Sequence, residues 1–127
     1  METTIMESWI YFLLPILMVV FGIWFIKIPK MPPEKPNIVV GYRTAKSSKN
    51  KDTWTFAHRY FGKLLLIAGV ILLILSVVAV IFMPNSKTEI IGWIFIVIQT
   101  VIGIIVPIIL TEKALNANFD NAGNRRL

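Results

Sequence analysis

Three segments of the chain carry no charged residue, and their lengths limit what the chain can fold into. They are Trp9 to Ile26, Leu64 to Met83 and Ile90 to Leu110, which hold 18, 20 and 21 residues. A helix needs roughly 17 to 25 apolar residues to cross the hydrocarbon core of a bilayer. An isolated strand would leave its backbone groups unpaired in lipid, so helices are predicted even though Ile and Val are abundant. We predict an all-α integral membrane protein, one domain over residues 1–127, with transmembrane helices at about residues 8–27, 64–83 and 90–110.

The composition agrees with a membrane protein and excludes several chemistries. Hydrophobic residues make up 56% of the chain and charged residues only 16%, against a charged share of roughly a quarter in soluble domains. With no cysteine and one histidine, thiol chemistry and Cys/His zinc sites are excluded. The sequence has no Gly-rich phosphate loop and no pair of acids placed for acid–base chemistry. We therefore predict no enzyme, no catalytic residue, no metal and no cofactor.

The distribution of Lys and Arg predicts the orientation in the membrane. Twelve of the thirteen lie in residues 27–63 or in the tail at residues 111–127, and only Lys87 lies in the turn between the second and third spans. The positive-inside rule then places the N-terminus outside and both the long loop and the tail in the cytoplasm of a multi-pass cell-membrane protein. The net charge of +6 indicates this topology and attraction to anionic lipid headgroups rather than direct binding of nucleic acid.

Small and polar residues inside the spans predict where the helices touch each other. Lipid-facing positions accept any large apolar side chain, whereas helix contacts select small or polar ones. The two prolines inside spans, Pro15 and Pro107, should each free a backbone carbonyl that a Thr or Gln side chain, or a ligand, could satisfy. Gln99 is the one strongly polar residue at membrane depth, and it either bonds another helix or contacts a ligand. The predicted contact stripes are Ser8, Tyr11, Pro15, Met18, Gly22; Gly62, Gly69, Ser76; and Gly92, Gln99, Thr100, Gly103.

The loop before the second span changes character along its length. Four prolines make residues 28–37 a stiff, extended strap. Asp52 offers an N-cap for a helix at residues 52–63, which has one apolar face and is expected to lie in the cytoplasmic membrane interface. Trp54 and Phe61 are then interface anchors, as are Trp9 and Trp93 near the ends of the other spans. His58 is expected at the border of the apolar face.

The same loop resembles a known signature. Residues Gly41-Tyr42-Arg43-Thr44, then Ser47, Lys49 and Asn50, then Trp54, Phe56 and Ala57, and finally Arg59-Tyr60-Phe61-Gly62-Lys63 resemble the SdpI family. This resemblance implies a membrane immunity protein that protects its own cell against a secreted, membrane-active peptide toxin. In the founding system of that family, the immunity protein also holds a transcriptional repressor at the membrane.

Arg43 is the residue of this loop with the most distinctive chemistry. Its guanidinium can grip a carboxylate or a phosphate with two parallel hydrogen bonds. Gly41 lets the backbone come close, and its neighbours offer hydroxyls and rings. In the alternative, Arg43 binds helix carbonyls or an internal acid such as Asp52 or Asp120 and only shapes the loop. The candidate ligand- or partner-binding residues are Gly41, Tyr42, Arg43, Thr44, Ser47, Trp54 and Gln99.

These observations predict an SdpI-like immunity protein whose partners are the lipid bilayer and a peptide toxin. A membrane-tethered scaffold that recruits a soluble partner, such as a transcriptional repressor, is the alternative. A small transporter subunit built by homo-oligomerisation ranks third, because no Asp, Glu, Lys, Arg or His lies inside a span.

Overall fold

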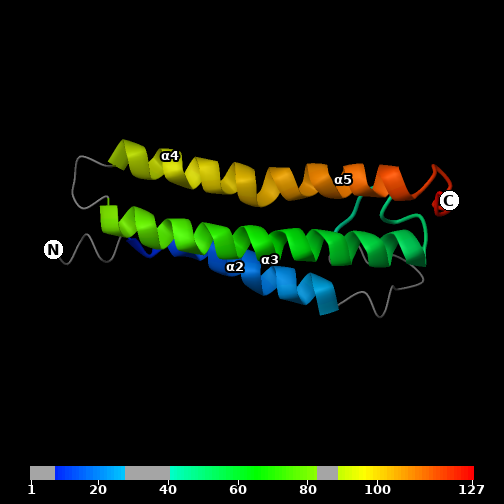
Figure 1. Cartoon of the computed structure of the whole chain (residues 1–127), viewed down its shortest axis with the longest axis horizontal. Coiled ribbons are helices and arrows are strands. Elements are labelled where there is room, and N and C mark those ends of the chain that lie inside the picture. The colour runs from blue at the N-terminus through cyan, green and yellow to red at the C-terminus, as the bar shows by residue number, and fades with distance from the viewer. Residues whose placement is uncertain (1–7, 28–40, 83–88) are drawn as a thin grey trace.

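Three long helical rods make up the described part of the protein. The computed structural model describes residues 8–27, 41–82 and 89–127, so the predicted strap at residues 28–37 lies outside the described residues. Helix α2 is Ile10–Lys27 and α3 is Lys51–Phe82, while α4 (Glu89–Thr100), the π-helical turn η3 (Val101–Ile105) and α5 (Val106–Asn118) together make the third rod (Figure 1). All three are long and apolar enough to cross a membrane. The predicted all-α, three-span fold is confirmed, and the described residues contain one isolated β-bridge but no strand.

Helix α3 begins earlier and runs longer than a single span requires. Residues 52–63 are helical, as predicted, but they are the first turns of α3 rather than a separate helix lying in the interface. At 1.5 Å per residue its 32 residues measure about 48 Å, against roughly 30 Å of hydrocarbon, so α3 extends beyond the hydrocarbon core. Its N-cap is Asn50 and not Asp52, because Asn50 Oδ1 accepts the Thr53 N–H at 2.9 Å and Thr53 Oγ1 accepts the Asn50 N–H at 3.1 Å.

Helices α2 and α3 pack backbone against backbone. A Cβ added at Gly22 would lie 2.8 Å from the Gly62 carbonyl oxygen, and one added at Gly62 would lie 2.8 Å from the Gly22 carbonyl oxygen. In lipid the hydrophobic effect does not drive helices together, so such close van der Waals packing at small residues has to do it. The predicted contact stripes are confirmed by the burial of Pro15, Met18, Gly22, Gly62, Gly69, Ser76, Gly92, Gln99 and Gly103, while Ser8 and Tyr11 are half-buried and Thr100 is exposed.

One polar node joins all three helices at membrane depth. Pro15 has no N–H for the Tyr11 carbonyl four residues before it. Ser76 Oγ of α3 donates to that carbonyl at 2.7 Å, and Gln99 Nε2 of α4 lies 3.2 Å from it and 2.8 Å from Ser76 Oγ. The prediction that a Gln side chain satisfies a carbonyl freed by proline is confirmed at Pro15. Gln99 thus bonds another helix, which was one of its two predicted roles.

Pro107 changes the helix rather than breaking it. Its ring would crowd the carbonyl of Gly103, four residues earlier. The turn ahead of it is π-helical, and the Val106 N–H bonds the Val101 carbonyl, one residue further back than in an α-helix. The wider turn makes room for the proline ring, so the third rod continues through Pro107 to Asn118.

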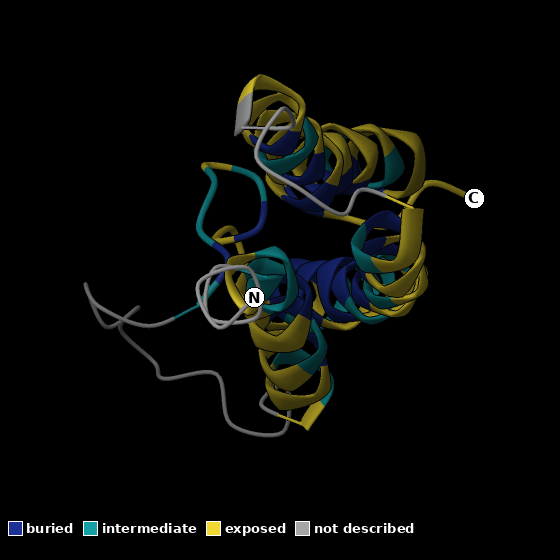
Figure 2. Ribbon diagram, turned by 90° about the vertical axis from the view of Figure 1, so that its left-hand side faces the viewer, coloured by how far each residue is buried: buried dark blue, intermediate teal, exposed yellow. Residues whose placement is uncertain are grey.

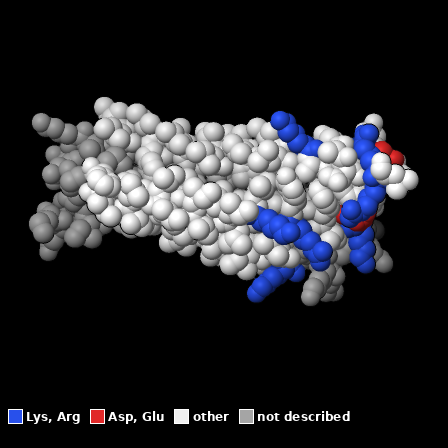
Figure 3. Space-filling model, viewed as in Figure 1, with Lys and Arg blue, Asp and Glu red and all other residues white. Residues whose placement is uncertain are grey.

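The outer surface and the two ends of the bundle differ in chemistry. Exposed positions along the helices are mostly Ile, Val, Leu and Phe, whereas the buried positions face inward (Figure 2). Lys and Arg gather where α3 begins and α5 ends (Figure 3). We call residues 41–63 and 111–127 the basic end. Trp9 directly precedes α2 and Trp93 lies in the first turns of α4, and they are 60% and 63% exposed. The anchoring role of these two tryptophans stays a prediction. Helix α4 begins at the end of the bundle opposite the C-terminus (Figure 1).

Candidate functional site

The loop at residues 41–50 folds back onto the first turns of α3. Gly41 has a φ of +116°, and a Cβ there would meet His58 Nε2 at 2.6 Å and the Trp54 ring at 2.9 Å. Glycine is therefore required both by the backbone angle and by the space. This close approach brings the Tyr42 N–H to 3.0 Å from His58 Nε2, to which it donates.

His58 is the residue around which the loop is organised. It is fully buried, and its Nδ1 lies 2.8 Å from the Trp54 carbonyl oxygen. Its ring packs on the Trp54 ring, with 4.1 Å between the two ring centroids. Because Nε2 accepts from a backbone N–H, the proton of the neutral ring sits on Nδ1 and is donated to that carbonyl. The expectation of a border position was wrong, since an apolar face read from sequence does not reveal that a distant loop covers it.

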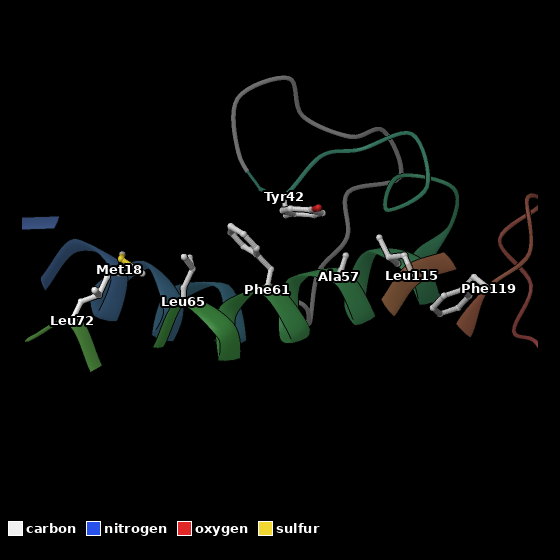
Figure 4. Close-up of a cluster of buried hydrophobic side chains, with 8 residues drawn as sticks. All are labelled: Met18, Tyr42, Ala57, Phe61, Leu65, Leu72, Leu115 and Phe119. Atoms are coloured by element: carbon white, nitrogen blue, oxygen red, sulfur yellow. The ribbon is translucent and has the colours of Figure 1, made fainter. Parts of the chain in front are cut away.

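Tyr42 connects the loop to the end of the third rod. Its hydroxyl donates to Glu112 Oε1 at 2.7 Å and lies 3.4 Å from the Ile108 carbonyl oxygen, while its ring packs on Phe61. Burial, together with the hydrogen bond and the charge of Glu112, raises the pKa of the Tyr42 hydroxyl far above its usual range. The hydroxyl therefore stays protonated and donates. Figure 4 shows Tyr42 and Phe61 in the buried cluster that runs from Leu72 to Phe119.

Trp54 and Phe61 belong to this interior rather than to the membrane surface. They are 5% and 9% exposed, which contradicts the expectation that both anchor an interfacial helix. The apolar face of residues 52–63 was recognised correctly, but it packs on Tyr42, on Phe25 of α2 and on the loop instead of on lipid. Amphipathicity alone does not show whether an apolar helix face packs on lipid or on another part of the protein.

Two pairs of short polar side chains shape the loop. The Thr44 N–H donates to Ser47 Oγ at 2.8 Å and the Ser47 N–H to Thr44 Oγ1 at 3.2 Å, which closes a turn in the way that Asn50 and Thr53 begin α3. Ser47 is fully buried, and its single O–H lies within hydrogen-bond distance of the Tyr42 and Thr44 carbonyl oxygens, at 3.1 and 3.2 Å. Thr44 and Ser47, predicted as ligand contacts, thus hold the loop in shape directly after Arg43.

The tail at residues 119–127 packs against the start of α3. Arg125 Nε and Nη2 grip the two carboxylate oxygens of Asp52 at 2.8 and 2.9 Å, and Asn50 Nδ2 donates to the Gly123 carbonyl at 2.7 Å. Phe119 is fully buried. Asp120 accepts the N–H groups of Ala122 and Asn124, and these bonds lower the pKa of its carboxyl. The basic end is therefore assembled from the loop, α3 and the tail together.

Arg43 is placed beside Trp54, and two of its guanidinium nitrogens have no acceptor among the described residues. Its guanidinium carbon lies 6.0 Å from the centre of the Trp54 ring, and its Nε and Nη2 are buried without a hydrogen-bond partner in the described part of the chain. The indole Nε1 of Trp54 is buried and unpartnered in the same way. Neither predicted internal acid binds Arg43, because Asp52 pairs with Arg125 and Asp120 with its own turn.

The structure thus brings most of the predicted ligand-binding residues together and separates one. Gly41, Tyr42, Arg43, Thr44, Ser47 and Trp54 form one loop-and-helix unit at the basic end, whereas Gln99 lies within the helical bundle. Among the described residues no group of three or more His, Cys, Asp and Glu side chains could hold a metal ion.

Comparison with known proteins covers the same region. Residues 34–111, more than half of the chain, match the sequence model of the SdpI/YfhL protein family. No curated protein and no solved structure gives a significant match. The chain belongs to the SdpI/YfhL protein family.

Proposed function

We propose that this member of the SdpI/YfhL protein family is a membrane immunity protein that protects the cell that makes it against a membrane-active antimicrobial peptide. The observation that carries the proposal is the family match over residues 34–111, because this range contains the loop, α3 and most of the third rod. The three-helix membrane fold supports it, since such a peptide acts on the bilayer in which these helices are embedded.

The proposed orientation puts the basic end in the cytoplasm. The arginines and lysines of the loop and tail gather there (Figure 3), which is the arrangement that the positive-inside rule favours. A peptide arriving from outside would then meet the apolar faces of the helices within the bilayer before it met the loop. Direct capture would take place among those faces, and the loop would control the packing of α3 against α5 through Tyr42 and Glu112.

Survival under peptide challenge tests this function. A bacterial strain sensitive to the secreted peptide toxin of the founding SdpI system would produce the wild-type protein, Arg43→Ala or Arg59→Ala. Membrane abundance of the three proteins would be matched by immunoblot. We expect the wild-type and Arg59→Ala proteins to protect, because Arg59 is exposed on the surface of α3, and Arg43→Ala to protect less. Absence of protection by the wild-type protein at verified abundance, against this and unrelated membrane-active peptides, would reject the immunity function.

A second candidate function is that of a scaffold for a soluble partner. The observation in its favour is that the loop and tail fold into one ordered surface at the basic end, joined by the Asn50–Gly123 and Asp52–Arg125 contacts. Cross-linking in cells followed by purification would identify a soluble protein bound to the wild type. In Asp52→Ala the tail loses its ion pair with α3. Recovery of the same partner protein with this variant, in an amount equal to that with the wild type, would argue against this surface as the binding site.

A further inference from the structure

The side chains at the basic end leave three hydrogen-bond donors without an acceptor in the described part of the chain. They are Nε and Nη2 of Arg43 and Nε1 of Trp54, all buried. A buried donor without an acceptor is unfavourable, and it is more so when it belongs to a charged group. Three such donors on two adjacent side chains, one of them cationic, indicate a site whose acceptor is a bound anion.

The acids described at this end already have other donors. Asp52 accepts from Arg125, Glu112 accepts from Tyr42, and Asp120 accepts from backbone N–H groups of its own turn. Arg125 shows how the edge of a guanidinium binds an oxyanion, because its Nε and Nη2 hold both oxygens of one carboxylate. Arg43 has the same edge of its guanidinium unpartnered, and this edge binds two oxygens of a planar or tetrahedral oxyanion in parallel.

The number of donors and their position favour a phosphate group. The Nε and Nη2 edge of Arg43 can bind two oxygens. A third unpartnered donor is the N–H of Trp54, whose ring centre lies 6.0 Å from the guanidinium carbon, and three donors suit an anion with more oxygens than a carboxylate has. Tyr42, the neighbour of Arg43, reaches Ile108 and Glu112, and these residues flank the predicted end of the third span at residue 110. The site therefore lies near the border of the hydrocarbon core, where the phosphates of lipids are found.

We propose that Arg43 and Trp54 form a binding site for a phosphate group, supplied by a phospholipid headgroup or by free inorganic phosphate. The loop holds the site in shape: Gly41 allows the close approach to Trp54 and His58, while the Thr44–Ser47 turn fixes the backbone on the other side of Arg43. This inference does not depend on the immunity function, and it is tested on the purified protein.

The test follows the indole N–H resonances of ¹⁵N-labelled full-length protein, purified in a maltoside detergent whose headgroup contains no phosphate. The chain has four tryptophans, and the Trp54 resonance is assigned by its loss in Trp54→Phe. Inorganic phosphate, lysophosphatidylglycerol, sodium acetate and sodium chloride are titrated separately at constant ionic strength. We expect a saturable shift confined to Trp54 with phosphate, which identifies free phosphate as a ligand, or only with the lipid, which identifies the headgroup.

Two conservative variants separate the site from general charge. Arg43→Lys keeps the charge but cannot present two parallel N–H groups, so the dissociation constant should rise about tenfold or more. Arg59→Lys makes the same change at an exposed arginine of α3 and should bind as the wild type does. The other three indole resonances report in each variant whether the fold is retained.

Three results would overturn the proposal. One is the absence of any saturable Trp54 shift with either phosphate source. The second is a Trp54 shift of equal size and affinity with acetate, which would assign the site to carboxylates. The third is unchanged binding in Arg43→Lys with the fold retained.

Discussion

The seam between α2 and α3 and the basic end of the bundle are held together by different means. At the seam, two backbones approach so closely that a Cβ added at Gly22 or Gly62 would lie 2.8 Å from the carbonyl oxygen of the other glycine, and a single polar node joins the helices. At the basic end, side-chain hydrogen bonds of Tyr42 join the loop to α3 and α5, and those of Asn50 and Asp52 join α3 to the tail. In lipid no hydrophobic effect drives helices together, so close packing at small residues holds the seam. At the basic end, directed polar contacts join the segments instead.

The stability of the two regions should therefore respond differently to a substitution that adds volume and to one that removes a hydrogen bond. The largest effect is expected at the seam. Gly62→Ala places a methyl group against the Gly22 carbonyl, which belongs to backbone and cannot rotate away, so the free energy of unfolding should fall by about 2–3 kcal/mol. Steric-trap or thermal unfolding in detergent measures this change.

The matched control for that substitution is Gly103→Ala. Its added methyl group meets the sulfur and terminal methyl of Met18, a flexible side chain that can move. A loss of stability at Gly103→Ala as large as that at Gly62→Ala would contradict backbone-to-backbone contact as the source of the seam's stability.

The second-largest loss of stability is expected at the basic end. His58→Leu keeps a buried apolar side chain but leaves the Tyr42 N–H without its acceptor, which should lower the free energy of unfolding by about 1–2 kcal/mol. Hydrogen exchange at the Tyr42 amide should accelerate more than exchange in the middle of α3. Equal acceleration at both places would show that the loop and the helix unfold as one unit, and that the two regions are not separable.

A smaller effect is expected for the polar node. Gln99→Leu removes the contacts to Ser76 and Tyr11, yet Ser76 Oγ still donates to the Tyr11 carbonyl. Hydrogen bonds between membrane helices contribute about 0.6 kcal/mol on average, so the unfolding free energy should fall by no more than about 1 kcal/mol. The double variant with Ser76→Ala should lose more than the sum of the two single variants, and strict additivity would show that the node does not act as a unit.

The smallest effect is expected for the exposed ion pair. Asp52→Asn weakens the contact with Arg125, whose side chain is 59% exposed, and the global unfolding midpoint should stay unchanged within error. Amide exchange at residues 119–126 should nevertheless increase, because the tail loses a contact to α3. A shift of the global midpoint would mean that the tail supports the whole bundle.

Much of the membrane part could be predicted from the sequence. The three uncharged segments are sufficient to place the helices, and small residues at helical spacing located the buried stripes. The sequence also indicated that a Thr or Gln side chain, or a ligand, could satisfy a carbonyl freed by proline, and the structure shows Gln99 in this role at Pro15. These signals are local, because a helix in lipid repeats its exposed and buried faces with a fixed period.

The basic end was harder to predict because its contacts join residues far apart in sequence. His58 meets Tyr42 across 16 residues, and Asp52 meets Arg125 across 73 residues. No periodic pattern records such pairs, so the Trp54 and Phe61 side chains were expected in the interface and His58 at a border. The resemblance did single out Arg43 and Trp54, but not the missing acceptor, which depends on where the other acids bind.

The contacts of the tail can form only after nearly the whole chain has been synthesised. When the ribosome makes Asn50 and Asp52, their partners Gly123 and Arg125 lie 73 residues ahead. Until the third rod has been inserted and residues 119–126 have emerged, the beginning of α3 lacks these partners. The loop around Arg43 therefore reaches its final surroundings last, and a nascent chain halted within the third rod would display a loop that the finished protein does not have.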